Sequence, residues 1–593
     1  MSTFFKPDQF LKWRAEHISD TTFVIGLSIL IGFLSGIAAY LLKISVAYIE
    51  DKLFSLYSVT EELLLFFFFP TVGIFLTVIF LKYIIKDNVG HGVPRILYVI
   101  SKLDGSMRRH KIFSSLIGGS LTAGFGGSVG LESPIISTGS SIGSFVGQSL
   151  KLQYKYKVLL IGCGAAGAIA SIFTTPITAI VFVFEVLMLD LGANALVPIL
   201  LAAVTGAVTT KVLLAEQILV HFKVTEPFEI KDVLFFIVLG IVSGFVSVYF
   251  HFAHFKIIEL FKKIKSIWAK ILIGGGLLGF LIYLFPPLFS EGYRAIRYIL
   301  SGHPEKLMYY AQFGDASNIW WLVGFVFLLI LFKVVATTLT TEAGGVGGIF
   351  APAAVMGGLT GFLLATLFNM FFHHLDLHIG NFTLVGMAGV LGGVLQAPLT
   401  GIFLIAEMSN GYELIVPLML ATSISFLIAR TFNKYSIFAQ KLDDIKSVYH
   451  FKDNAVLKQL SVKDLVEKDV LTISINSQLK DLIKLIKVSK RNIFVVLDGE
   501  VFIGLILLDD VRKAMFDPSK YETPISEYLY VPLEEDKINL DDDMHEIIGK
   551  FNRSGNYNMI VLDGNKYVGL LSRANLFKAY REGLLKQEEQ EKL

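Results

Sequence analysis

Five long apolar runs constrain the fold of this chain more than any other feature of its sequence. They cover residues 22–47, 63–85, 233–252, 271–289 and 320–335. An apolar run of about 20 residues is long enough to cross the hydrocarbon core of a bilayer as a helix. Only 17% of the 593 residues are charged, against about 25% in soluble domains. The sequence therefore predicts a polytopic α-helical membrane protein.

Charge, cysteine content and short motifs exclude several classes of function. The net charge is +2 and no long basic stripe is present, which argues against a nucleic-acid partner. The single cysteine, Cys163, excludes an internal disulfide and a thiol-rich metal site. A phosphate-binding G-x-x-x-x-G-K-[ST] loop is missing, which disfavours an ATP-driven pump. The G-x-S-x-G matches at residues 126–130 and 139–143 follow no predicted strand, so we expect neither a hydrolase nor another enzyme.

The stretch GGSVGLESP at residues 126–134 places a glutamate within an apolar region. A glycine-rich turn followed by proline starts a helix with its N–H groups uncovered, and the positive end of the helix dipole then attracts anions. A carboxylate inside a bilayer costs about 2.5–3.5 kcal/mol on insertion scales, so we expect a functional role for Glu132. The stretch predicts an anion site that the Glu132 carboxylate can itself occupy.

The membrane region contains an internal duplication. GGSVGLESP is followed by a segment at residues 164–185, and GGVGGIFAP at residues 344–352 is followed by a matching segment at residues 386–407. In both segments a proline lies twelve residues after the first glycine, and a glutamate lies nine residues after that proline. Interrupted helices at matching places in two halves are typical of a transporter site built from half-helices. We therefore expect the site where the halves meet, with Phe350 as the counterpart of Glu132.

The composition changes sharply after residue 441. Charged residues become frequent, and short β-branched runs alternate with helical patterns, which indicates a soluble α/β module. This module is also duplicated, since residues 496–514 align without a gap on residues 561–579, a spacing of 65 residues. The predicted division is a cytoplasmic N-terminal segment at 1–21, a membrane domain at 22–441, a linker at 442–457, a first soluble repeat at 458–518, and a second repeat with a tail at 519–593.

Four motifs in order resemble those of the CLC family of chloride channels and chloride/proton exchangers. They are GHGVP at residues 90–94, GLESP at 130–134, GIFAP at 348–352, and a late tyrosine, Tyr435. The tail resembles a pair of cystathionine-beta-synthase (CBS) domains. The resemblance implies an inverted-repeat CLC-type membrane domain followed by a soluble α/β CBS pair.

The resemblance also implies how such a protein works. It implies a homodimer in membrane lipid, in which each subunit has its own pathway for chloride or another small anion and requires no cofactor. Glu132 is then the gating glutamate, which competes with the anion and can accept a proton. The implied anion-binding residues are His91, Gly130, Glu132, Ile349, Phe350 and Tyr435. The implied selectivity motifs contribute Gly90, Gly92, Pro94, Ser133, Pro134, Gly348 and Pro352.

Two positions depart from the family pattern. His91 replaces a serine; a neutral imidazole can donate one N–H to an anion, titrate as a pH sensor, or fill space, so the anion preference stays open. Val186 replaces an internal proton-transfer glutamate, directly after Glu185. Valine carries no proton, which slightly favours a passive, voltage-gated chloride channel. The alternative is a chloride/proton antiporter that uses Glu132 and a water path. For Glu185 and its repeat mate Glu407 we expect a structural hydrogen-bonding role.

A rival from another class is a CBS-regulated cation transporter. Such a protein should place several acidic residues at membrane depth, whereas only one glutamate joins the glycine-rich helix starts here. Lys6, Lys12 and Arg14 predict a cytoplasmic N-terminus, and we expect the basic links at residues 101–111 and 151–157 on the same side. The soluble tail that follows is then also cytoplasmic, and we expect the protein in the cell (inner) membrane.

The CBS pair carries part of a nucleotide-binding pattern, G-x-x-[ST]-x-x-[DN]. The second copy has Gly569, Ser572 and Asn575; the first has Asp510, but Leu507 replaces the hydroxyl. Binding of an adenine nucleotide and a purely stabilising role for the pair are both open.

Overall fold

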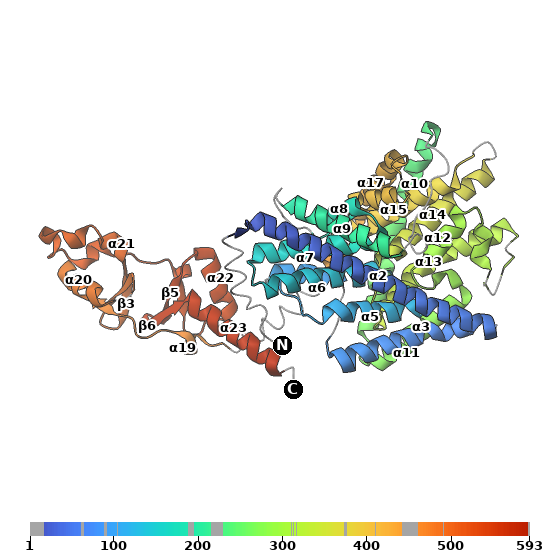
Figure 1. Cartoon of the computed structure of the whole chain (residues 1–593). Coiled ribbons are helices and arrows are strands. Elements are labelled where there is room, and N and C mark those ends of the chain that lie inside the picture. Colours follow the sequence, from blue (N-terminus) through green and yellow to red (C-terminus); the bar gives the residue numbers. More distant parts are fainter. Residues whose placement is uncertain are drawn as a thin grey trace. The chain divides into compact units, whose positions relative to one another are not determined.

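The computed structural model describes residues 17–60, 64–87, 92–103, 105–187, 195–214, 229–309, 311, 314–315, 317–372, 376–409, 411–441, 460–489 and 491–590. The chain forms two compact units, Met1–Ile445 and Lys446–Leu593. The first holds the membrane helices and the second holds the sheet (Figure 1).

The regular elements described in the first unit are helices. In the described part of the chain, nine helices are long and apolar enough to cross a membrane, so the prediction of a polytopic α-helical membrane protein is confirmed. The helices are α2 (Asp20–Thr60), α3 (Leu65–Ile79, continued by a π-helix at Phe80–Ile85), α4 (Gly92–Lys102), α5 (Lys111–Gly124), α6 (Glu132–Ser149), α7 (Tyr154–Phe173), α8 (Pro176–Glu185), α9 (Leu196–Leu214), α10 (Val233–Lys262), α11 (Ile267–Leu284), α12 (Tyr293–Leu300), α13 (Ile319–Glu342), α14 (Phe350–Phe371), α15 (Ile379–Leu395), α16 (Pro398–Met408) and α17 (Ile415–Phe432).

The duplication predicted from the sequence is visible in how the helices pack. Helix α6 lies along α7, as α14 lies along α15. A Cβ added to Gly139 would lie 2.2 Å from the carbonyl oxygen of Gly164, and one added to Gly357 would lie 2.2 Å from that of Gly386. Small residues let membrane helices approach this closely. The two halves therefore use the same glycine contact at corresponding positions.

Two short helices of the repeat cap each other. Helices α8 and α16 each begin at a proline. The Glu185 carboxylate accepts hydrogen bonds from Leu399 N at 3.0 Å and from Thr400 N and Oγ1 at 2.7 Å each. In return, Glu407 accepts from Ile177 N at 3.0 Å, Thr178 N at 2.8 Å and Thr178 Oγ1 at 2.6 Å. The structural role predicted for both glutamates is confirmed, since each occupies the N-terminus of a helix from the other half.

The second unit is an α/β module with one six-stranded sheet of order β1-β2-β3-β6-β5-β4. The strands of the first and second repeat meet at β3 and β6, and both repeats shift register at the same place, Val496/Leu497 and Val561/Leu562. The duplicated α/β tail is therefore confirmed. Its elements are α19 (Val462–Leu465), β1 (Thr472–Ser474), α20 (Leu479–Val488), β2 (Ile493–Asp498), β3 (Val501–Leu507), α21 (Leu508–Val511), β4 (Lys537–Asn539), α22 (Met544–Ser554), β5 (Asn558–Asp563), β6 (Lys566–Ser572) and α23 (Arg573–Gln590).

In this unit, a segment outside each repeat's own strands packs into the hydrophobic core of the other repeat. Val462, which precedes the first repeat's sheet, is buried with Met559 and Val561 of the second. Ile525, which follows the first repeat, is buried with Leu479 and Phe494 of the first. The core of the second repeat therefore includes a residue from the start of the first.

Candidate anion site

The starts of α6 and α14 are joined by a short backbone ladder. Gly130 N donates to Gly348 O at 2.9 Å, and Gly348 N donates to Gly130 O at 2.8 Å. A side chain at either position would meet the Glu132 carboxylate, because an added Cβ would lie 2.1 Å from Glu132 Oε2 at Gly130 and 2.6 Å from Glu132 Oε1 at Gly348. The two glycine-rich stretches predicted to begin helices therefore meet, one from each half of the repeat.

Glu132 occupies the N-terminus of α14. Its side chain is 2% exposed, and Oε1 accepts hydrogen bonds from Phe350 N at 2.7 Å and Ala351 N at 3.0 Å. These are the first N–H groups of α14, where the helix dipole favours negative charge. Among the described residues, Oε2 has no hydrogen-bond partner. A carboxylate of the first half thus fills a site for negative charge built by the second half.

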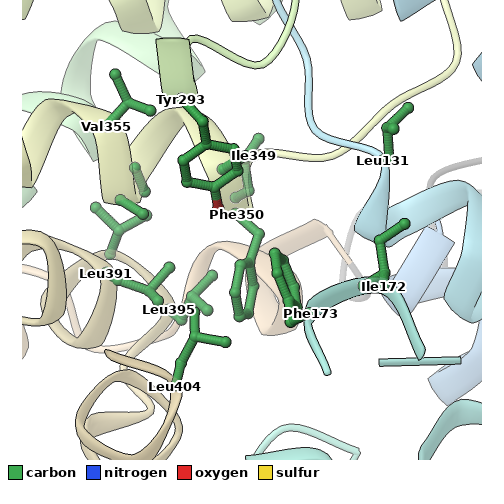
Figure 2. Close-up of a cluster of buried hydrophobic side chains, with 14 of the residues drawn as sticks. Leu131, Ile172, Phe173, Tyr293, Ile349, Phe350, Val355, Leu391, Leu395 and Leu404 are labelled. Carbon is green, nitrogen blue, oxygen red and sulfur yellow. The ribbon is translucent and has the colours of Figure 1, made fainter. Parts of the chain in front are cut away.

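Phe350, the repeat counterpart of Glu132, takes a different role. Its ring stacks on Phe173 with centroids 5.6 Å apart and meets Phe182 edge-on at 6.4 Å. Figure 2 shows the Phe350 and Phe173 rings side by side within the buried apolar cluster. In the described structure the N–H of Phe350 holds the Glu132 carboxylate while the ring packs against aromatic neighbours.

A small cavity of about 40 Å³ adjoins the Glu132 carboxylate. It brings together residues of three of the predicted motifs, and we call it the gate cavity. It is lined by Val93, Pro94, Glu132, Ser133, Ile136, Phe182, Thr341, Gly347, Gly348, Ile349, Phe350, Ile437, Phe438 and Lys441. Gly92 also belongs to this arrangement, since a Cβ at that position would lie 1.9 Å from Ser133 Oγ. This volume has room for roughly one to three water-sized particles.

Some predicted site residues lie elsewhere. Gly90 and His91 are outside the described residues. Tyr435 is 49% exposed and is not among the residues that line the gate cavity, whereas the nearby Ile437 and Phe438 are. The structure does not bring the Tyr435 hydroxyl to the cavity, and its role as a ligand remains a prediction.

The prolines of the two main motifs lie inside their helices. Pro134 is buried in α6 and contacts α5, since a Cβ at Gly119 would lie 2.8 Å from Pro134 Cγ. Pro352 is buried in α14. Both therefore support the helix starts without lining the gate cavity.

Val186 lies at the end of α8, where its N–H bonds Phe182 O. Its side chain is buried and cannot hold a proton. The preceding Glu185 is fully engaged as the cap of α16, so neither residue offers a free carboxylate here.

Two charged residues near the site were missed from the sequence. Glu291 Oε1 accepts a hydrogen bond from Leu131 N at 3.2 Å, next to Glu132 in the chain. Lys333, buried in α13, donates to Ser128 Oγ at 2.9 Å and to Ser290 O at 3.1 Å. The available signal was a lysine inside the apolar run at residues 320–335 and a glutamate two residues after the run at residues 271–289.

Two of the candidate nucleotide residues of the CBS pair, Ser572 and Asn575, already have partners within the chain. Ser572 Oγ accepts from Asn575 N at 3.2 Å, and Asn575 Nδ2 donates to Glu467 Oε1 at 2.7 Å. Glu467 also forms an ion pair with Arg491. A Cβ at Gly569 would lie 2.4 Å from Glu467 O, while Asp510 is exposed on α21. A carboxylate beside Asn575 repels phosphate, so these residues fit a nucleotide poorly in this arrangement.

Comparisons with known proteins agree with this geometry. The family description "Voltage gated chloride channel" matches residues 73–430, and "CBS domain" matches residues 462–517. The H(+)/Cl(-) exchange transporter ClcA of Vibrio cholerae serotype O1 (strain M66-2) is 25% identical over 364 residues, which cover 60% of this chain and 74% of the relative. The protein of the same name from Yersinia pestis bv. Antiqua (strain Angola) is 25% identical over 345 residues, covering 58% and 70%.

Solved structures share the fold. A slow cyanobacterial Cl-/H+ antiporter superposes with a TM-score of 0.61 at 22% identity, over 71% of this chain and 97% of that one. A CLC-type fluoride/proton antiporter gives a TM-score of 0.57 at 25% identity, over 70% and 97%. A eukaryotic CLC transporter gives 0.57 at 15% identity, over 93% of this chain and 97% of that one.

Proposed function

The chain belongs to the voltage-gated chloride channel (CLC) family, and we propose that it carries chloride or another small anion across a membrane past Glu132. The observation that supports this most directly is the Glu132 carboxylate at the N-terminus of α14, held by Phe350 N and Ala351 N. A carboxylate there stands in for a bound anion. Backbone N–H groups attract an anion without the full positive charge that would trap it.

The way Glu132 is held supports its role as a gate. Glu185 and Glu407 each use both carboxylate oxygens and receive a threonine hydroxyl in addition. Glu132 is held through Oε1 only, and its Oε2 has no partner among the described residues. Fewer charge-assisted hydrogen bonds must break for Glu132 to leave. Glu132 is therefore the one of these three carboxylates suited to exchange with an anion.

We further propose that transport is coupled to protons. Protonation removes the negative charge of Glu132 and weakens its attraction to the N–H groups of α14, so the anion can replace it. The relatives named as H(+)/Cl(-) exchange transporters support this alternative over the passive channel. The passive channel is the second candidate. Val186 supports it, because a valine side chain cannot carry a proton. The gate cavity, with its backbone donors, gives a cation transporter little support.

The deciding experiment is the reversal potential of purified protein in liposomes under combined chloride and proton gradients. Exchange predicts a potential that shifts with the pH gradient, whereas a passive channel predicts one set by chloride alone. Glu132→Gln removes the titratable proton, so the pH-dependent part should disappear while the anion pathway remains.

The matched control is Glu259→Gln, a glutamate whose side chain is 66% exposed, which should behave as wild type. Flux that follows the cation, or a Glu132→Gln protein with unchanged pH dependence, would contradict the proposal.

The remaining features extend the proposal to the whole protein. We propose a homodimer in the cell (inner) membrane, with both termini in the cytoplasm and the CBS pair acting there. Exposed apolar side chains such as Ile177, Leu200 and Leu399 on α8, α9 and α16 support burial by lipid or a second subunit. Adenine-nucleotide binding stays a prediction for the CBS pair, because Asn575 is engaged with Glu467.

A further inference from the structure

A second carboxylate lies at the start of α6. Glu291 Oε1 accepts from Leu131 N at 3.2 Å, directly before Glu132. This resembles how Glu132 itself occupies the start of α14. The next residue, Gly292, has φ +94°, and a Cβ there would lie 3.0 Å from Lys333 Nζ. A left-handed conformation with so close a neighbour favours glycine.

Glu291 faces a cavity of about 500 Å³ that is separate from the gate cavity. The two are lined by consecutive residues, Leu131 and Glu132. The charged residues of the larger cavity are Lys43, Glu50, Asp51, Glu291, Arg294, Arg297 and Lys306. Four positive groups thus share it with three carboxylates, and its volume suits hydrated ions.

Lys43 is the unusual member of this set. It lies on α2 and is only 7% exposed, it lines the cavity, and among the described residues its Nζ has no hydrogen-bond partner. Its electrostatic partner is Glu291. A buried ammonium without hydrogen bonds is costly, so such a group needs an anion or another acceptor.

Lys333 is a second buried lysine in this region, and its ammonium group has hydrogen-bond acceptors. Its Nζ donates to Ser128 Oγ and Ser290 O, and it also interacts electrostatically with Glu291. Lys43 therefore differs from Lys333 in having no hydrogen-bond partner for its ammonium group among the described residues.

We propose that this cavity binds a small inorganic anion at Lys43, in competition with the Glu291 carboxylate. Glu291 would occupy the positive end of α6 when the anion is absent and yield to it when the anion enters. Chloride as the anion rests on the proposed function; the site itself rests on Lys43 and Glu291. The anion would then be bound in a cavity that is lined by Leu131, the residue directly before Glu132.

The test uses bromide, whose anomalous scattering locates it in crystals of the full chain. Bromide density is expected beside Lys43, stronger in Glu291→Gln because the competing charge is gone while an acceptor for Leu131 N remains. Lys43→Met keeps the length of the side chain but removes its charge, so the density should vanish. Density beside Lys43 in neither the wild type nor Glu291→Gln would overturn the site.

Flux measurements give a second readout. Losing a charge-assisted hydrogen bond should raise the chloride concentration for half-maximal flux at least about fivefold in Lys43→Met. The control is Lys256→Met, which removes an equal charge at a side chain 60% exposed on α10. Equal half-saturation in the two variants would contradict the inference. Absence of any chloride flux in the wild type would instead contradict the proposed function, without bearing on bromide density at Lys43.

Discussion

At the scale of single residues, the number of hydrogen bonds distinguishes the capping Glu185 from Glu132, for which we propose exchange with an anion. Glu185 and Glu132 are both glutamates aimed at the N-terminus of a helix from the other half. Glu185 is bound through both oxygens, whereas Glu132 is bound through one. Their chemistry is the same, so the difference in role comes from their surroundings.

Gly130→Ala should displace Glu132, the proposed gate. The three atoms nearest to an added Cβ all belong to the Glu132 carboxyl group, the closest at 2.1 Å. The flexible end of a side chain yields more easily than backbone, so the fold should persist while Glu132 leaves Phe350 N and Ala351 N. Chloride flux should become less dependent on pH, as measured in liposomes.

Gly324→Ala is the control for this change, because nothing lies within 4 Å of an added Cβ there. A Gly130→Ala protein that folds and keeps the pH dependence of wild type would argue against Glu132 as the gate.

At the scale of elements, helices that begin inside the protein depend on caps from the other half of the repeat. Glu185 of α8 caps α16, and Glu407 of α16 caps α8. In the same way, Glu132 of α6 caps α14. The first N–H groups of a helix have no partner within it. Each cap therefore also fixes how the two halves meet.

Glu185→Ala should destabilise the membrane unit by about 2 kcal/mol, because it leaves the partly buried Thr400 N and the neighbouring Leu399 N without their acceptor. Glu407→Ala should have a similar effect, since its contacts mirror those of Glu185. Thermal unfolding in detergent measures both.

Glu413→Ala, at an exposed position after α16, serves as the control and should change the midpoint little. If Glu185→Ala unfolded at the same temperature as this control, the capping role would be refuted.

At the scale of the whole molecule, each of the two units is built from two copies of a repeat. The membrane unit pairs its halves through helix starts, and the soluble unit pairs its repeats through β3 and β6. In the soluble unit Glu467 follows α19 yet pairs its backbone with Leu570 of the second repeat. Its side chain bridges Arg491 of the first repeat and Asn575 of the second.

Glu467→Gln should raise the affinity of the CBS pair for an adenine nucleotide, if that pair binds one. The substitution removes a negative charge beside Asn575 and frees Arg491 for phosphate. Titration calorimetry of the full chain with ATP should show at least a severalfold tighter binding than in wild type.

Glu522→Gln, whose side chain is 85% exposed, controls for the loss of charge. Absence of binding in wild type and in Glu467→Gln would favour a purely structural role for the CBS pair.

The homodimer is tested by the mass of the purified protein in detergent, measured by light scattering. We expect twice the chain mass of 65.7 kDa, because apolar side chains such as Ile177 and Leu399 are exposed on α8 and α16. Replacing Leu399 by a charged residue should shift the mass toward one chain, whereas replacing the equally exposed Phe245 of α10 tests whether any apolar site has this effect. A single-chain mass for the wild type would refute the dimer.

The sequence by itself determined the membrane class, both duplications, and the glycine-rich stretches that begin helices. These features depend on local physics, namely the length of apolar runs, the alternation of strands, and the conformations open to glycine and proline. It also indicated a functional role for Glu132, since a carboxylate in an apolar region is costly. A structural hydrogen-bonding role for Glu185 and Glu407 followed from their matching positions, whereas only the structure showed that each caps a helix of the other half.

Only the tertiary structure decided which groups meet. Glu132 accepts hydrogen bonds from Phe350, 218 residues away in sequence. Glu291 and Lys43 share a cavity, although no motif links them. Tyr435, which the motif pattern places at the site, does not line the gate cavity. The reason is physical, because a hydrogen bond depends on distances set by how the two halves pack, and local sequence does not specify those distances.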